Sequence, residues 1–228
     1  MYPTYFREDI EAWQSLVHVC RRWRNLALGS PRRLNLRLFC TPKTPTRDTL
    51  DVWPALPLIV ECNMSSTSRT DNIIAALGQS NRVCQVLLSH LASWQLEGVL
   101  AVMQVPFPEL TDLRLSSYDE TLVLPLIPDS SLDGSAPRLR TFFLGGIPFP
   151  GLSNLLLSAT HLVDLRLKNI SNSGYISPES VLSSLRTLCL ELQSLRLRPD
   201  RKTRGLPPPK PSVLPALVFF VSKVLPNI

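Results

Sequence analysis

The stretch Leu110-Thr-Asp-Leu113-Arg-Leu115 places apolar residues at the first, fourth and sixth positions of a six-residue pattern. Its last two apolar residues alternate at period two, which is typical of a strand that buries one face. The pattern returns at intervals of 29, 23 and 23 residues, as Leu139-Arg-Thr-Phe142-Phe-Leu144, Leu162-Val-Asp-Leu165-Arg-Leu167 and Leu185-Arg-Thr-Leu188-Cys-Leu190. Such near-regular spacing indicates a repeated structural unit.

An earlier copy, Val83-Cys-Gln-Val86-Leu-Leu88, fits the pattern 27 residues before the first of these. The sequence therefore predicts parallel strands in one curved sheet, near residues 83–88, 112–116, 140–144, 163–167 and 186–190.

Helix signals lie between the copies of the pattern. In residues 70–78, Thr70 or Asp71 is a candidate N-cap and Gly78 a stop. Residues 93–104 place Leu96, Val99, Leu100 and Met103 on one helical stripe. The stretch that begins Ser177-Pro178 also has a cap followed by proline at the first helical position.

No single helix–strand unit of this kind buries both of its faces, whereas stacked neighbours form a continuous core. The copies of the pattern resemble the LxxLxL core of leucine-rich repeats, without the usual Asn or Cys three residues after the last leucine. We therefore expect an α/β fold, an irregular leucine-rich-repeat solenoid with parallel strands on the concave face and helices outside.

Composition excludes several classes of protein. The chain has 228 residues, of which 42 are leucine and only 9 glycine, and it contains no glycine-rich phosphate loop, Gly-x-Ser-x-Gly or His-Glu-x-x-His motif. No apolar run reaches about 18 residues, so no membrane span is predicted. The N-terminus lacks the features of a signal peptide, and we expect a cytoplasmic or nuclear protein. No cofactor is implied.

The cysteines and histidines do not form a recognisable reactive or metal-binding motif. Five cysteines lie far apart, without the paired spacing of two to four residues that zinc sites use. They are expected to be buried reduced thiols. His18 and Cys20 lie two apart on one predicted helix and face different ways, and the chain is not expected to be an enzyme.

The formal charge of +6 is unevenly distributed. Residues 12–47 contain eight basic residues and no acid, and a second basic cluster, Arg196 to Lys210, lies in a proline-rich segment. Both clusters suit an anionic partner such as nucleic acid, which leaves a basic nucleic-acid-associated protein as one alternative.

The N-terminal stretch Leu16-Val-His-Val-Cys20-Arg-Arg-Trp23-Arg-Asn-Leu26 has the apolar spacing of a helix. It resembles the second half of an F-box, in which a Leu-x-x-Val-Cys-Arg-x-Trp helix precedes the first strand of the substrate module. Together with the repeats, it resembles the F-box proteins abundant in mushroom-forming fungi. On this resemblance we expect an N-terminally incomplete F-box, because the sequence lacks the usual Leu-Pro and first helix ahead of this stretch.

The resemblance implies a non-catalytic adaptor, the substrate receptor of a cullin–RING ubiquitin ligase. Its partners are then a Skp-family linker protein and an unidentified protein substrate. The residues expected to dock on the linker are Trp13, Leu16, Val17, Val19, Cys20, Trp23 and Leu26. The same helix suits the capping of an open solenoid end equally well, so a repeat-only scaffold without ligase docking is the other alternative.

Substrate is expected to contact the outward positions of the strands. These are Asp112, Arg114, Thr141, Phe143, Asp164, Arg166, Thr187 and Cys189. The aspartates and arginines among them also suit a ladder of surface ion pairs, which stabilises little.

Four segments are predicted from these features. They are a partial F-box at 1–33, the solenoid at 34–192, a basic proline-rich linker at 193–212 and a short apolar C-terminal segment at 213–228.

Overall fold

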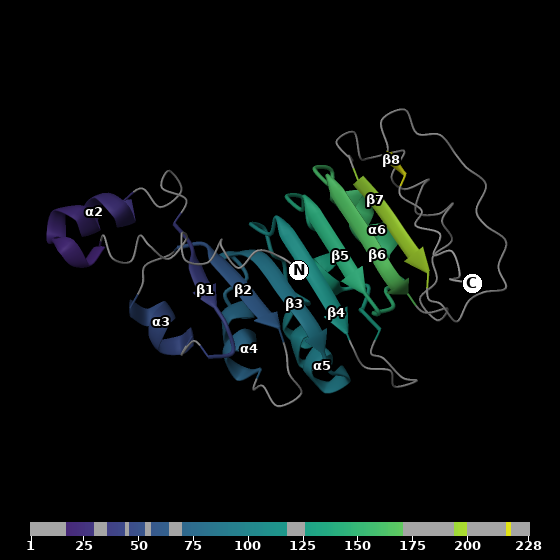
Figure 1. Cartoon of the computed structure of the whole chain (residues 1–228), viewed down its shortest axis with the longest axis horizontal. Coiled ribbons are helices and arrows are strands. Elements are labelled where there is room, and N and C mark those ends of the chain that lie inside the picture. Colours follow the sequence, from purple (N-terminus) through teal and green to yellow (C-terminus); the bar gives the residue numbers. More distant parts are fainter. Residues whose placement is uncertain are drawn as a thin grey trace, which may run out of the picture.

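The fold is known from a computed structural model, which describes residues 17–29, 36–43, 46–52, 56–63, 70–117, 126–170, 194–199 and 218–219. Within these residues, eight strands form one sheet in which every neighbouring pair is parallel (Figure 1). The order of the strands across the sheet is their order along the chain. The expected α/β class with a parallel sheet is thus confirmed.

The strands are short, and a helix or a 3-10 turn separates neighbouring strands in the first five steps of the sheet. The strands are β1 (Leu38–Cys40), β2 (Leu58–Asn63), β3 (Val83–Leu91), β4 (Asp112–Ser117), β5 (Thr141–Gly145), β6 (Asp164–Ile170), β7 (Ser194–Pro199) and β8 (Val218–Phe219). The helical elements are α2 (Arg21–Gly29), α3 (Thr46–Val52), α4 (Asp71–Leu77), α5 (Ser93–Val102), η1 (Ser131–Gly134) and α6 (Leu152–Ser158).

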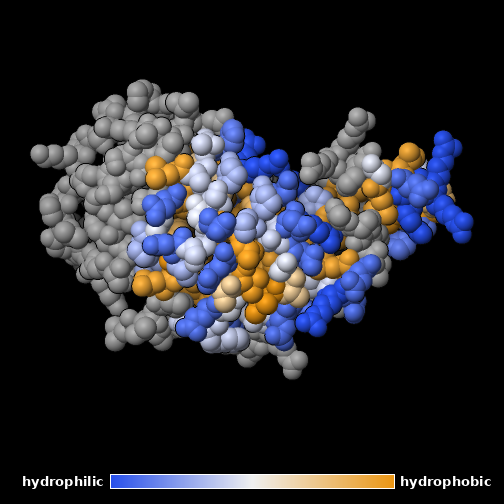
Figure 2. All heavy atoms as spheres, turned by 180° about the vertical axis from the view of Figure 1, so that it is seen from behind, coloured by the Kyte–Doolittle hydropathy of each residue, from blue (hydrophilic) through white to orange (hydrophobic). Residues whose placement is uncertain are grey.

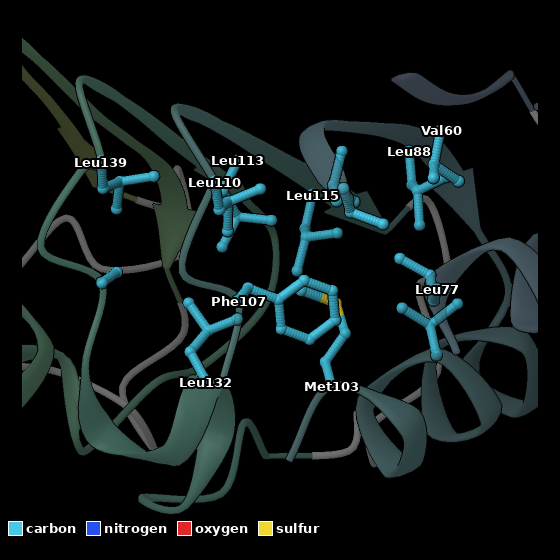
Figure 3. Packing of buried hydrophobic residues seen from close by; sticks show 14 of the residues in the cluster. Val60, Leu77, Leu88, Met103, Phe107, Leu110, Leu113, Leu115, Leu132 and Leu139 are labelled. Atoms are coloured by element: carbon cyan, nitrogen blue, oxygen red, sulfur yellow. The ribbon is translucent and has the colours of Figure 1, made fainter. Parts of the chain in front are cut away.

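The core lies between one face of the sheet and the layer of helices. Figure 3 shows Val60, Leu88 and Leu115 of the strands facing Leu77 and Met103 of the helical layer. All five side chains are buried. Along β4 and β6, buried apolar side chains alternate with half-buried or exposed polar ones, so the apolar side chains of these strands point to one face of the sheet.

The predicted helix α5 begins and packs as expected. The backbone N–H of Ala92 donates to the Gln95 side chain at 2.9 Å, which satisfies one free donor at the start of the helix. The predicted stripe of Leu96, Val99, Leu100 and Met103 is buried throughout.

Helix α4 also lies where it was predicted. Thr70 stands at the N-cap position, although its side chain makes no capping hydrogen bond. The helix ends before Gly78, whose N–H donates to the carbonyl of Ile74. The predicted helix that begins at Ser177 lies outside the described residues.

Strands β3 to β6 confirm four of the five predicted strands, and the fifth prediction needs correction. The predicted strand 186–190 lies outside the described residues, and the strand that pairs with β6 is β7. The chain carries a further copy of the pattern there, Leu192-Gln-Ser-Leu195-Arg-Leu197, in which Leu195 and Leu197 align with Leu165 and Leu167.

The predicted boundary at residue 192 is therefore wrong. The first part of the predicted basic linker, Ser194–Pro199, belongs to the sheet. Proline ends this strand, as expected of a residue that has no N–H to donate to a ladder. Within the predicted apolar C-terminal segment, Val218 and Phe219 pair with Ser194 and Leu195 of β7.

Removal of one inward leucine should destabilise the whole sheet. Leu165 on β6 is fully buried, and Leu165→Ala should lower the free energy of unfolding by about 2–4 kcal/mol because it leaves a cavity. Leu157 on α6 is 48% exposed, and Leu157→Ala should change the free energy of unfolding by less than about 0.5 kcal/mol. Urea denaturation of both variants measures the difference, and equal losses would contradict this assignment of the core.

Candidate functional site

The N-terminal helical end of the molecule exposes several large apolar side chains. Residues 17–19 are helical, and α2 follows after an interruption at Cys20. The Cys20 carbonyl accepts a hydrogen bond from the Arg24 N–H at 3.1 Å, so Cys20 occupies the N-cap of α2. The single helix predicted through this stretch is thus broken at Cys20.

Apolar residues of this end fall into two groups. Val17 and Ala27 are buried, and the Val17 carbonyl accepts a hydrogen bond from Arg24 Nε at 3.1 Å. By contrast, Val19 is 67%, Trp23 51% and Leu26 61% exposed. Trp23 and Leu26 lie three residues apart on α2 and therefore share a face.

The predicted docking residues differ in whether their side chains are exposed. Val19, Cys20, Trp23 and Leu26 are accessible to a partner, whereas Val17 is not, because it packs into the core. Trp13 and Leu16 lie outside the described residues.

The accessible apolar residues of α2 are flanked by charge. Arg21, Arg22 and Arg24 are exposed beside them. Figure 1 shows α2 beyond β1, at one end of the row of strands. In Figure 2, hydrophobic and strongly hydrophilic residues meet at this end of the molecule, on the right. The exposed Val19, Trp23 and Leu26 with their arginines are called the terminal helix surface below.

A second candidate surface is the face of the sheet that points away from the buried leucines, called the polar face below. The predicted residues on β4, β5 and β6 all have half-buried side chains that alternate with buried ones. They are Asp112, Arg114, Thr141, Phe143, Asp164 and Arg166. The predicted Thr187 and Cys189 lie outside the described residues.

Strand register arranges these residues in rows across the sheet. One row contains Gln85, Asp112, Thr141 and Asp164, and continues with Ser194 on β7. The next row contains Leu87, Arg114, Phe143 and Arg166, and continues with Arg196. Ser194 and Arg196 thus occupy the register positions that the sequence analysis gave to Thr187 and Cys189.

The carboxylates of the first row already have partners. Asp164 Oδ2 lies 2.5 Å from Arg166 Nη2, and its Oδ1 accepts a hydrogen bond from Arg166 Nε at 3.0 Å. Asp112 Oδ2 accepts hydrogen bonds from Gln85 Nε2 at 3.1 Å and from Thr111 Oγ1 at 2.8 Å. Of the ion pairs expected from the sequence, Asp164 and Arg166 form one within β6, while Asp112 accepts hydrogen bonds from the neutral side chains of Gln85 and Thr111.

A polar cluster that the sequence analysis did not identify lies where β2, β3 and β4 end. His90 has a left-handed backbone (φ 60°), within a register shift of β3 against β4 between Leu88 and Leu91. His90 Nδ1 lies 2.9 Å from Asn63 Oδ1, and the His90 N–H donates to Ser116 Oγ at 3.3 Å. A left-handed histidine is not apparent from sequence, because the shift depends on strand pairing.

The described cysteines fit the expectation of buried thiols except at one position. Cys40, Cys62 and Cys84 are buried, and Cys20 is exposed. Burial raises the pKa of Cys40 and of Cys62 to about 11, and it also raises the pKa of Cys84. Such thiols stay protonated at neutral pH and are poor nucleophiles.

Other classes of site receive no support from the part of the chain that the structure describes. There, no three His, Cys, Asp or Glu side chains lie close enough together to hold a metal ion. None of the described helices is long and apolar enough to cross a membrane.

Comparisons with protein-family models, with curated proteins and with solved structures found no match to this chain. The two surfaces are therefore interpreted from their own residues.

Thiol accessibility gives a direct test of this arrangement. In the native protein at neutral pH, a maleimide reagent should modify Cys20 well before Cys40, Cys62 or Cys84, because the last three are buried and protonated. Mass spectrometry of peptides from timed samples measures the order. In urea the difference in labelling rate between Cys20 and the other three cysteines should disappear. Rapid labelling of Cys62 in the native protein would show that the sheet is not packed as described.

Proposed function

We propose that the protein is a non-catalytic interaction adaptor, an F-box-type substrate receptor of a cullin–RING ubiquitin ligase. The observation that carries the proposal is the terminal helix surface, where Val19, Trp23 and Leu26 are each more than half exposed. Clustered apolar side chains in contact with water are unfavourable and commonly mark protein-binding sites. These residues belong to the stretch whose sequence resembles the linker-docking helix of an F-box.

The proposal includes a finer description of the fold, a leucine-rich-repeat-type solenoid. Support comes from strands that follow one another in chain order, and from β1 to β6, each of which has buried apolar residues two apart. In such a fold each unit contacts its neighbours only, and one side of the sheet is available to a partner.

The proposed mechanism is tethering. The terminal helix surface holds the ligase, and the polar face holds a protein substrate. A substrate lysine then meets the ubiquitin-charged enzyme at a high effective concentration, which accelerates transfer without chemistry by this chain. An adaptor of this kind requires no catalytic residue and no cofactor.

One observation favours the repeat-only scaffold as a second candidate. Val17 and Ala27 belong to the hydrophobic core, so this helical end has a packing role of its own. A helix that covers the open end of a row of strands needs such contacts whether or not it binds a ligase. The two functions differ in whether the exposed residues bind a linker protein.

Substitution of Trp23 distinguishes the ligase adaptor from the repeat-only scaffold. Trp23→Ala should abolish capture of a purified Skp-family linker protein, because it removes the largest exposed side chain of the terminal helix surface. Trp94 on α5 is 56% exposed, and Trp94→Ala is the matched control that should leave capture unchanged. Surface plasmon resonance with the immobilised linker measures both.

If the unaltered chain does not bind the linker, the repeat-only scaffold replaces the ligase adaptor. If Trp23→Ala binds as well as the unaltered chain, docking uses a different surface. Equal melting temperatures of both variants would show that neither result is due to unfolding.

A further inference from the structure

The terminal helix surface is positively charged. Arg21 and Arg22 begin α2, whose first turn contains no acidic residue, and Arg24 follows Trp23 on the same helix. None of the carboxylates in the part of the chain that the structure describes forms an ion pair with these three arginines. The sequence has no acidic residue from position 12 to position 47. The positive charge of the three arginines is therefore available to a partner.

The first two arginines do not stabilise the helix that carries them. The N-terminal end of a helix has a partial positive charge, so cations in the first turn are unfavourable there. Arg21 and Arg22 occupy that turn of α2. An anionic group bound beside them would relieve the repulsion. The two arginines are thus better suited to binding an anion than to stabilising α2.

Charged and apolar side chains share one side of α2. Arg22 lies four residues before Leu26, and Trp23 lies three residues before it, so both neighbour Leu26 on the helix surface. The Nε–H of Arg24 donates to the carbonyl of the buried Val17 at 3.1 Å, which fixes the position of this exposed arginine. A partner that covers Trp23 and Leu26 therefore also meets arginine side chains.

We propose that the terminal helix surface binds an acidic protein surface, on which carboxylates surround an apolar pocket that receives Trp23 and Leu26. The carboxylates accept hydrogen bonds from Arg21, Arg22 and Arg24. This inference rests on the proposed function and names the chemistry of the partner at the same site. Tryptophan and arginine dominate the binding energy of many protein interfaces, and a guanidinium pairs with a carboxylate through two parallel hydrogen bonds.

The exposed apolar residues distinguish this partner from other anionic ones. The phosphate backbone of a nucleic acid would pair with the arginines but would leave Val19 and Leu26, which are 67% and 61% exposed, in water. A lipid surface favours a helix with a continuous apolar face. On α2, by contrast, only Trp23 and Leu26 are exposed large apolar residues, and Ala27 is buried. An acidic protein surface matches both the charge and the small apolar area.

The kinetics of binding to the immobilised Skp-family linker give the first test. Attraction between opposite charges accelerates association, so the association rate of the full chain should fall about tenfold from low to high ionic strength, with little change in the dissociation rate. Arg22→Gln should lower the association rate about threefold, the effect of one exposed charge pair. Surface plasmon resonance measures both rates.

A synthetic probe tests the inference without the linker. The probe is a fluorescein-labelled amphipathic peptide of leucine and glutamate at helical spacing, and fluorescence anisotropy measures its affinity for the full chain. The affinity should exceed that of the matching peptide with lysine in place of glutamate, and it should fall as ionic strength rises. Arg22→Gln should weaken binding of the glutamate peptide about threefold.

Arg140→Gln is the matched control for net charge. Arg140 is also exposed, but it lies directly before β5, in the middle of the row of strands. Both substitutions remove one positive charge, and Arg140→Gln should leave binding of the linker and of the peptide unchanged. Equal melting temperatures of the two variants would show that the difference between them is due to binding.

Failure of this inference and failure of the proposed function are separate results. If the linker does not bind but the glutamate peptide binds and depends on Arg22, the ligase adaptor is overturned and the acidic partner is supported. If the linker binds at a rate that depends on neither ionic strength nor Arg22, the acidic partner is overturned and the ligase adaptor is supported.

Four further outcomes would overturn the inference. They are no binding of either probe, equal binding of the glutamate and lysine peptides, equal weakening by Arg22→Gln and Arg140→Gln, and tighter binding of another anionic partner. For the last, the full chain is tested with a deoxythymidine oligonucleotide and with phosphatidylserine vesicles. Tighter binding of either would indicate a nucleic acid or a membrane in place of an acidic protein.

Discussion

The alignment of inward apolar side chains from strand to strand is the constraint on which the structure depends. Parallel register places Val60, Val86, Leu113, Phe142 and Leu165 in one row across β2 to β6, and all are buried. A short strand with two inward side chains cannot form a core alone. Each strand buries apolar side chains of the strand beside it. The positions of the helices, the polar face and the terminal helix surface therefore depend on this row of buried residues.

The sequence alone predicted those parts of the fold that follow from the local spacing of apolar residues. Leu113 and Leu115, or Leu165 and Leu167, alternate with polar residues, and this alternation reveals both the strand and its buried face. For the same reason Arg114 and Phe143 could be placed on the polar face. The exposed side chains of Trp23 and Leu26 also follow from helical spacing, whereas the break at Cys20 does not.

The sequence was less informative where two copies of one pattern compete. The copies that begin at Leu185 and Leu192 lie seven residues apart, and the first has the more regular spacing. In the structure β6 pairs with the second, so basic residues that had been interpreted as a linker belong to the sheet. Spacing alone cannot decide between them, since pairing depends on how the intervening chain closes. The place of Arg196 and Arg198 in β7 was missed for that reason.

Strand order also determines how the molecule can change in length. Within the described sheet, every strand has hydrogen bonds only to the strands before and after it in the chain. In a doubly wound sheet, by contrast, strands that follow one another in the chain are not all neighbours in the sheet. Here one more strand with its connection could be inserted between two existing strands and would separate only that pair. Each such unit would widen the polar face by one strand, so internal duplication could lengthen this sheet without changing the other strand pairs.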